Sequence, residues 1–300
     1  MIDTAQLYVV IVSMVMLLGL LIGSFLNVVI HRVPAGISLM RPSQCPSCDA
    51  PVRPWQNVPV LSWIALRGRC ARCRTSISVR YPLVELGIAA AFAAVAWWWT
   101  TQAHPGGLHV SPTLPDGSGI LTAILEADPW SGPIAAQAVV LIIMLWFAAS
   151  GIALAIIDLD VRRLPASIVR TAIFAILVLL VLACLLGADW WALARAGISM
   201  LLLYVFYALL RAARPGGMGG GDVRLAALIG LVLGWLGLPE LIIGAFAAFV
   251  LGGLFGIGLM MFRRATRRTA VPFGPWMIVG AWVGAVVGPA LAHWYLGLFG

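Results

Sequence analysis

The sequence predicts an all-α protein that crosses a membrane about eight times and carries a small cysteine-rich module on one side. Of its 300 residues, 62% are hydrophobic and only 10% are charged, and the mean hydropathy is +1.02. A soluble domain is roughly half apolar and about a quarter charged. This excess of apolar surface indicates that lipid is the solvent. The second observation is a series of long apolar runs, and the third is two C-x-x-C pairs in a polar segment between the first two runs.

Eight apolar runs come near the length of about 17–25 residues that a membrane-spanning helix needs. They cover residues 7–30, 83–99, 134–157, 168–186, 190–210, 223–238, 241–262 and 276–299. The first run has Asp3 ahead of it and no basic segment, so we expect a retained span and not a cleaved signal. The sixth run is short, and with the seventh it could instead form a re-entrant hairpin around Pro239.

The basic residues predict the orientation of the chain. The formal charge is +8 and the chain has no lysine, so every basic residue is arginine. All the arginines except Arg195 lie between the apolar runs or near their ends, on one side. The positive-inside rule assigns that side to the cytosol and puts both termini outside. This pattern indicates topology control and no nucleic-acid partner. The absence of lysine also excludes a Walker-type phosphate loop and a lysine Schiff base.

Two long connections divide the chain into three expected parts. Residues 1–100 hold the first helix, a cytosolic segment and the second helix. Residues 101–133 form an outward loop, where His104 and His109 are expected to be solvated. Residues 134–300 hold the remaining membrane helices.

Four cysteines in the cytosolic segment predict a metal site. Each C-x-x-C pair can bind one metal from a tight turn, and four thiolates complete the tetrahedron that zinc prefers. The cytosol is reducing, which disfavours structural disulfides. The alternatives are a redox pair or free thiols, and Cys184, in an apolar run, is expected to serve packing. The expected zinc ligands are Cys45, Cys48, Cys70 and Cys73.

Two aspartates are expected at similar depth on the cytosolic side. Asp158 ends the third apolar run and Asp222 begins the sixth. Taken singly, Asp158 could belong to an interfacial charge cluster and Asp222 could be a helix N-cap. Taken together, two neighbouring carboxylates cannot both ionise cheaply, so one retains its proton. Such a pair can activate water and polarise a peptide carbonyl.

A glycine-rich stretch, residues 215–221, precedes Asp222. We expect it to be non-helical, to adopt positive φ and to let other backbone approach closely. An extended substrate strand could then lie against Gly219 and Gly221. The alternative is a phosphate cradle, for which a glycine-rich loop without lysine is weak evidence.

Seven segments, in this order, resemble the bacterial prepilin peptidases, the GxGD class of membrane aspartic peptidases. The resemblance covers nearly the whole chain, including both C-x-x-C pairs. Its motifs are 23–34 (GSFLNVVIHRVP), 57–63 (NVPVLSW), 67–70 (RGRC), 77–85 (ISVRYPLVE), 157–165 (IDLDVRRLP), 217–222 (GMGGGD) and 272–275 (PFGP). It implies that Asp158 and Asp222 are the catalytic pair. Asp160 is the local competitor, but it lies about 200° around a helix from Asp158.

The resemblance also implies the substrates and the location. Family members sit in the bacterial inner membrane and cut type IV prepilins or type II secretion pseudopilins after a glycine that ends a basic leader. They then methylate the new N-terminal residue with S-adenosylmethionine. By this resemblance residues 1–100 are associated with methyl transfer and residues 134–300 with peptidase activity. The outward loop looks longer than the family pattern leads us to expect.

Glu85 is the remaining candidate site residue, because it is an acid just inside an apolar run. It could hold the incoming amine or the cofactor, or form an ion pair with Arg80 or another arginine. Three alternative functions remain at this point: a peptidase without methyl transfer, a membrane scaffold with a zinc docking module, and a proton-coupled transporter. The sequence does not indicate an oligomeric state.

Overall fold

A computed structural model describes residues 4–102, 128–130, 132–214, 218–261 and 272–298. The expectations for His104 and His109, for most of the outward loop and for the arginines between 262 and 271 lie outside these residues. The chain divides into two compact units, residues 1–104 and 105–300, and each is described by itself.

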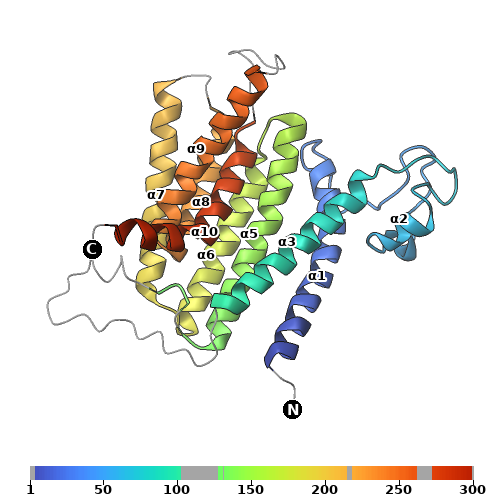
Figure 1. The fold of residues 1–300 in the computed structure, drawn as a ribbon. Helices are drawn as coiled ribbons and strands as arrows, with labels where there is room; N and C mark the ends of the chain where they lie inside the picture. Colours follow the sequence, from blue (N-terminus) through green and yellow to red (C-terminus); the bar gives the residue numbers. More distant parts are fainter. Residues whose placement is uncertain (1–3, 103–127, 131, 215–217, 262–271, 299–300) are drawn as a thin grey trace. The chain divides into compact units, whose positions relative to one another are not determined.

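The first unit is a pair of long helices with a small module in the connection between them (Figure 1). The helices are α1 (Thr4–Arg32) and α3 (Arg80–Gln102), and the connection holds the one-turn helix η1 (Pro54–Asn57) and the short helix α2 (Leu61–Ala65). A Cβ on Gly19 would lie 2.8 Å from the Cα of Ala89, and one on Gly23 would lie 2.7 Å from the Cα of Glu85. These two glycines form a G-x-x-x-G pattern, which allows membrane helices to approach closely.

The described residues of the second unit form a bundle of six helices (Figure 1). The described helices are α5 (Ile134–Val161), α6 (Ala166–Leu185), α7 (Trp190–Ala213), α8 (Gly220–Leu236), α9 (Leu238–Met261) and α10 (Gly274–Leu296). The central helix is α8, which packs against α6, α7, α9 and α10. Its residues from Val223 to Leu236 are all buried except Arg224. A helix that is apolar on all sides belongs in the interior, so the other helices separate α8 from lipid.

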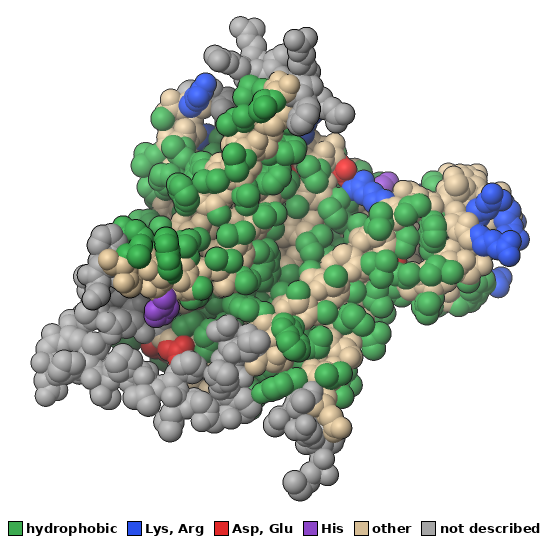
Figure 2. Space-filling model, in the orientation of Figure 1, with side chains coloured by type: hydrophobic (Ala, Val, Ile, Leu, Met, Phe, Trp, Pro, Cys, Tyr) green, Lys and Arg blue, Asp and Glu red, His purple; other side chains and the backbone are tan. Residues whose placement is uncertain are grey.

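Each predicted apolar run lies mainly within one helix, and the lengths of these helices support a multi-pass membrane protein. Among the described residues, seven helices are long and apolar enough to span a bilayer. The exception is α8, whose 17 residues correspond to about 25 Å at 1.5 Å per residue. Pro239 lies inside the first turn of α9, and α9 itself is 24 residues long. Figure 2 shows hydrophobic side chains over the outer surfaces of the helices, where lipid is the expected neighbour.

Arg195 lies within α7, as expected from the fifth apolar run, and it is only 2% exposed. Its guanidinium donates hydrogen bonds to the carbonyls of Gly234 and Trp235, each at 2.7 Å, and to that of Leu236 at 3.4 Å. These are the last carbonyls of α8, which have no partner within the helix. A positive charge is also favoured at a helix C-terminus. Arg195 therefore caps α8 from the side of α7.

Small residues bring α7 and α8 together along the rest of their length. A Cβ on Gly230 would lie 2.5 Å from the carbonyl oxygen of Ser199 and 2.9 Å from the Cα of Met200. Gly234 meets the side chain of the same serine. At Gly230 the neighbours are backbone atoms of α7, so there is no room for a side chain. This packing and the Arg195 cap set the rotation and depth of α8.

We therefore expect Gly230→Ala to lower the thermal unfolding midpoint of the purified protein. The added methyl group meets backbone atoms that cannot rotate away, and overpacking of this kind costs about 1–3 kcal/mol. Gly253→Ala is the matched control, since a Cβ there has no neighbour within 4 Å. Equal midpoints for the two variants in the same detergent would contradict the close α7–α8 contact.

Candidate active site and metal centre

Asp158 is held at the end of α5 by the backbone of α10. Asp158 is 5% exposed, and its Oδ2 accepts a hydrogen bond from the Gly274 amide at 3.1 Å. Gly274 is the first residue of α10, so its amide is one of those left unpaired at a helix N-terminus. A Cβ on Gly274 would lie only 2.8 Å from that oxygen. Glycine is therefore the residue that lets the backbone reach the carboxylate.

Asp222 lies in the first turn of α8. Its Oδ2 accepts a hydrogen bond at 2.9 Å from the amide of Gly219, the residue that caps the helix. Asp222 is thus not the N-cap itself but the third helical residue. Its side chain closes the first turn by accepting the hydrogen bond from the N-cap amide. An acid is favoured at this end of a helix. This hydrogen bond engages one of the two carboxylate oxygens of Asp222.

The side chain of Leu164 packs close to both aspartates. It is buried in the turn between α5 and α6, a few residues after Asp158. Its side chain lies 2.7 Å from where a Cβ on Gly221 would be and 3.4 Å from where one on Gly274 would be. It therefore packs beside both the residue before Asp222 and the residue that binds Asp158. Both predicted aspartates therefore lie around the same leucine side chain. Asp160, by contrast, is exposed.

The glycine-rich stretch differs in part from its expected conformation. Gly219 is extended, with φ −73° and ψ 151°, while Gly220 and Gly221 belong to α8. The expected positive φ is therefore wrong for these three residues, and residues 215–217 lie outside the described part. The close neighbours of Gly220 and Gly221 are side chains: a Cβ on Gly220 would lie 2.9 Å from the Arg211 guanidinium and one on Gly221 would lie 2.7 Å from Leu164. Because α8 begins at Gly220, Asp222 lies in its first turn, directly after the Gly221 that packs against Leu164.

An aromatic cluster that the sequence did not reveal lies beside this site. Tyr207 of α7 is buried and stacks on Phe249 of α9, with ring centroids 5.6 Å apart. Both rings contact Phe273, the residue immediately before Gly274. The cluster therefore supports the start of α10 and the amide that Asp158 binds. The conspicuous P-F-G-P motif was the available signal for Phe273 and Gly274, but no pattern pointed to Tyr207.

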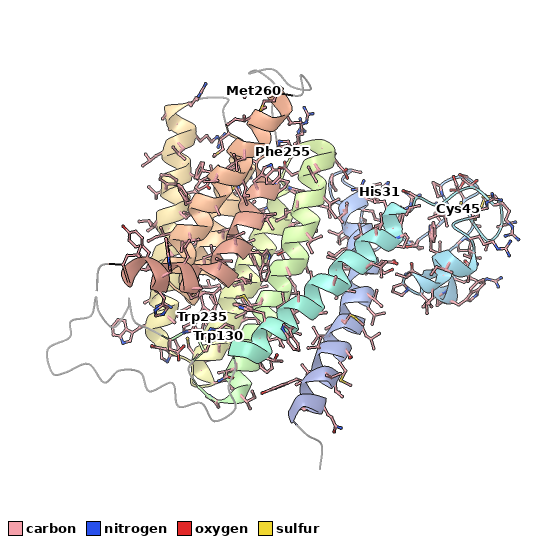
Figure 3. All side chains as sticks on the ribbon, viewed as in Figure 1. His31, Cys45, Trp130, Trp235, Phe255 and Met260 are labelled. Carbon is pink, nitrogen blue, oxygen red and sulfur yellow. The ribbon has the colours of Figure 1, made fainter. Side chains whose placement is uncertain are left out.

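The four cysteines of the connection form a second candidate site, as predicted. Their sulfur atoms all lie within 4.8 Å of one another, and those of Cys45 and Cys73 are 3.8 Å apart. Figure 3 labels Cys45 in this module, away from the helices α1 and α3. Four sulfurs at this separation fit a single tetrahedral metal ion.

The two C-x-x-C turns have the same backbone hydrogen bonds. The amide of Cys45 donates to the carbonyl of Ala50, and the amide of Cys70 donates to that of Thr75. The residues after the second cysteines, Asp49 and Arg74, both have positive φ. Each turn is also closed by a single β-bridge, Gln44 to Pro51 and Arg69 to Ser76. The module is thus built from two equivalent turns that present their sulfurs to each other.

The thiols differ in how readily they ionise. The hydroxyl of Thr75 is hydrogen-bonded to the Cys73 sulfur at 3.3 Å and, with the Thr75 backbone, lowers the pKa of Cys73 to about 6. For Cys48 the amide of Ala50 lowers the pKa, but desolvation and the neighbouring sulfurs outweigh it and raise the pKa to about 11. A metal binds the thiolate form. Cys73 is therefore more readily ionised than Cys48.

Glu85 lies in α3 and is buried at 7% exposure. Its Oε2 accepts a hydrogen bond from the amide of Val60 at 2.7 Å, and its side chain is also hydrogen-bonded to Ser24. The carboxylate thus joins α3 to α1 and to the residue that precedes α2.

This combination defines the class of protein: a multi-pass membrane protein with two carboxylates held together at helix ends, the arrangement expected of a membrane aspartic peptidase. Comparison with known proteins agrees. The model for the bacterial peptidase A24 N-terminal domain matches residues 17–99, and the model for the type IV leader peptidase family matches residues 141–257. The chain belongs to the type IV leader peptidase family.

Similar curated proteins cover nearly the full chain. The chain is 31% identical to the "Prepilin leader peptidase/N-methyltransferase" of Aeromonas hydrophila, over 95% of this chain and 93% of the relative. It is 32% identical to that of Stutzerimonas stutzeri, over 94% and 92%, and 35% identical to that of Neisseria gonorrhoeae, over 91% and 89%. No solved structure matches the chain.

We expect the purified protein to contain one metal ion per chain, bound by the four cysteines. Cys45→Ser or Cys73→Ser should lower the metal content well below one, because three thiolates bind a tetrahedral ion less well than four. Cys184→Ser is the control, since Cys184 is buried in α6 and does not belong to the cluster of four cysteines. Elemental analysis provides the measurement, and a parent protein without metal would refute the assignment.

Proposed function

We propose that this protein removes the leader from type IV prepilin-like proteins and then methylates the new N-terminal residue. The observation that carries the proposal is the pair Asp158 and Asp222, each bound through one oxygen by a backbone amide and joined through Leu164. The relatives' name, prepilin leader peptidase/N-methyltransferase, supports both activities. Because this one name states two activities, it gives no support to a peptidase without methyl transfer or to a membrane scaffold.

The two aspartates would act as one acid–base unit. Two adjacent carboxylates share a proton, because the second cannot ionise cheaply beside the first. The ionised carboxylate takes a proton from water, and the protonated one donates a hydrogen bond to the scissile carbonyl. Gly219, which is extended and exposed, offers its backbone to an extended substrate strand. Gly221 contributes by letting Leu164 approach.

The orientation follows from the arginines. The end of the second unit that holds Asp158 and Asp222 also holds Arg162, Arg163 and Arg211. Under the positive-inside rule this end faces the cytosol, where a basic leader would remain before cleavage. We place the protein in the bacterial inner membrane with both termini outside.

Two bound groups complete the proposal. Zinc is the metal best matched to four thiolates in a reducing compartment, and it would fold a segment that has little apolar core. S-adenosylmethionine would supply an electrophilic methyl group to the new amine. The acidic Glu85, buried next to Ser24, is the candidate in the first unit for favouring a cationic amine or sulfonium.

The cleavage proposal predicts that Asp158→Asn and Asp222→Asn each reduce leader removal by at least about a hundredfold, the usual contribution of a general acid or base. Asp160→Asn should have little effect, since Asp160 is exposed. Each variant is co-expressed with a candidate prepilin, whose mass reports leader removal and methylation together. A parental cleavage rate in Asp222→Asn would exclude the proposed pair.

The methyl-transfer proposal predicts that Glu85→Gln preserves leader removal but lowers methylation. Glutamine can still accept the Val60 hydrogen bond, so the substitution removes mainly the charge. Asp49→Asn, an exposed acid in the same unit, is the control. The same mass measurement separates the steps: loss of both indicates a structural role for Glu85, and unchanged methylation removes it from the site.

A further inference from the structure

A groove of about 310 Å³ lies wholly within the first unit, between the C-terminal half of α1 and the segment before α2. From α1 it is lined by Ser24, Phe25, Val28 and Arg32, and from the segment by Arg41 and Asn57 among others. Its volume is at the lower end of the range for small-ligand sites, about 300–1,000 Å³. The peptidase chemistry does not use this groove.

Two arginines give one end of the groove a positive charge. The guanidinium of Arg32 donates hydrogen bonds to the carbonyls of Ser38, Leu39, Arg41 and Pro42, which hold residues 38–42 beside α1. Within the part of the chain that the structure describes, no carboxylate forms an ion pair with Arg32 or Arg41. Carbonyls satisfy the hydrogen bonds but do not neutralise the charge. This end of the groove therefore favours an anionic group such as a carboxylate.

A buried acid lies behind the wall at the level of Ser24. Ser24 is two helical turns, or about 12 Å, from Arg32 along α1. Its side chain is hydrogen-bonded to the carboxylate of Glu85. Pro59, which also lines the groove, is followed directly by Val60, whose amide donates to the same carboxylate. The groove thus has basic residues near one end, an acid behind the other, and Phe25 and Val28 between them.

The wall beside Glu85 contains a strained turn. Val60 has φ 59° and ψ −50°, and the amide of Leu61 donates to the carbonyl of Pro59 across it. This is a γ-turn of the rare form with positive φ, and a β-branched residue is especially unfavourable there. Such strain persists only when surrounding contacts over-determine it, and it clusters at ligand sites. Glu85 supplies that contact through the Val60 amide.

We propose that this groove binds the methyl donor S-adenosylmethionine. Arg32 and Arg41 would hold its carboxylate, Phe25 and Val28 its apolar parts, and the Glu85 charge behind Ser24 would favour its sulfonium. The inference rests on the proposed methyl transfer. It accounts for the opposite charges at the two ends, whereas the phosphate of a lipid headgroup would use the arginines alone. Asn57 adds an amide that can pair with a base or a sugar hydroxyl.

The test is direct binding of S-adenosylmethionine to the purified full-length protein in detergent, measured by equilibrium dialysis. Val28→Trp should fill the groove and raise the Kd at least tenfold. Val10→Trp is the matched control: it places the same side chain on α1 at an exposed position that does not line the groove. The thermal unfolding midpoint of each variant reports on its folding.

A second pair of variants tests the charge without filling the groove. Arg41→Gln should raise the Kd about three- to tenfold, whereas Arg53→Gln, which removes the same charge outside the groove, should leave it unchanged. Both arginines are exposed, so these substitutions do not depend on a core position.

Three results would overturn the inference. The first is a parental Kd, within twofold, in both Val28→Trp and Arg41→Gln. The second is loss of co-purifying anionic phospholipid from Val28→Trp, measured by mass spectrometry, with an unchanged Kd; the groove would then be a lipid site. The third is equal weakening by Val28→Trp and Val10→Trp. If the parent protein methylates prepilin while any of these holds, only the groove assignment is lost. A parent that neither binds the donor nor methylates would instead refute the methyl-transfer part of the proposed function.

Discussion

A bilayer offers no water to groups buried within it, so each charge and each open helix end must find a partner inside the protein. In the second unit, charged side chains and open helix ends bind each other. The N-terminal amide of α10 binds Asp158, and Arg195 binds the C-terminal carbonyls of α8. Both pairings also follow the helix dipole, with the acid at an N-terminus and the base at a C-terminus. The hydrogen bonds that stabilise these buried charges also fix the ends of the helices relative to one another.

The central helix α8 shows how this constraint positions the aspartates. Its C-terminal end, where Figure 3 labels Trp235, is held by Arg195. Its middle lies against the backbone of α7 at Gly230, and its first turn is closed by Asp222. A helix fixed at both ends and in the middle has little freedom to slide or rotate. Asp222 is therefore presented at one depth, which a reaction requiring two aligned carboxylates needs.

The first unit uses the same principle at its polar end. Glu85 does not stand alone in an apolar helix, because it binds the amide of Val60 and the side chain of Ser24. That contact ties the cysteine module to both long helices and holds the strained γ-turn in place. In the module, two equivalent turns bring four sulfurs together where there are few apolar contacts. A metal would supply the stability that packing does not.

Composition and the lengths of the apolar runs were enough to predict the helices, because within a bilayer a single apolar segment has no other way to pair its backbone. Spacing likewise predicted that the four cysteines converge. The hypothesis that Asp158 and Asp222 form the catalytic pair came from their places at helix ends, read with the family resemblance. The amide that binds Asp158 was not predictable in the same way, since it lies 116 residues away in the chain. Nor were the partners of Glu85, the burial of Arg195 or the helical conformation of Gly220 and Gly221. Each of these depends on which helices pack side by side, and one-dimensional patterns of polarity do not contain that information. The sequence by itself determined which residues are able to do chemistry, whereas the tertiary structure decided what each of them touches.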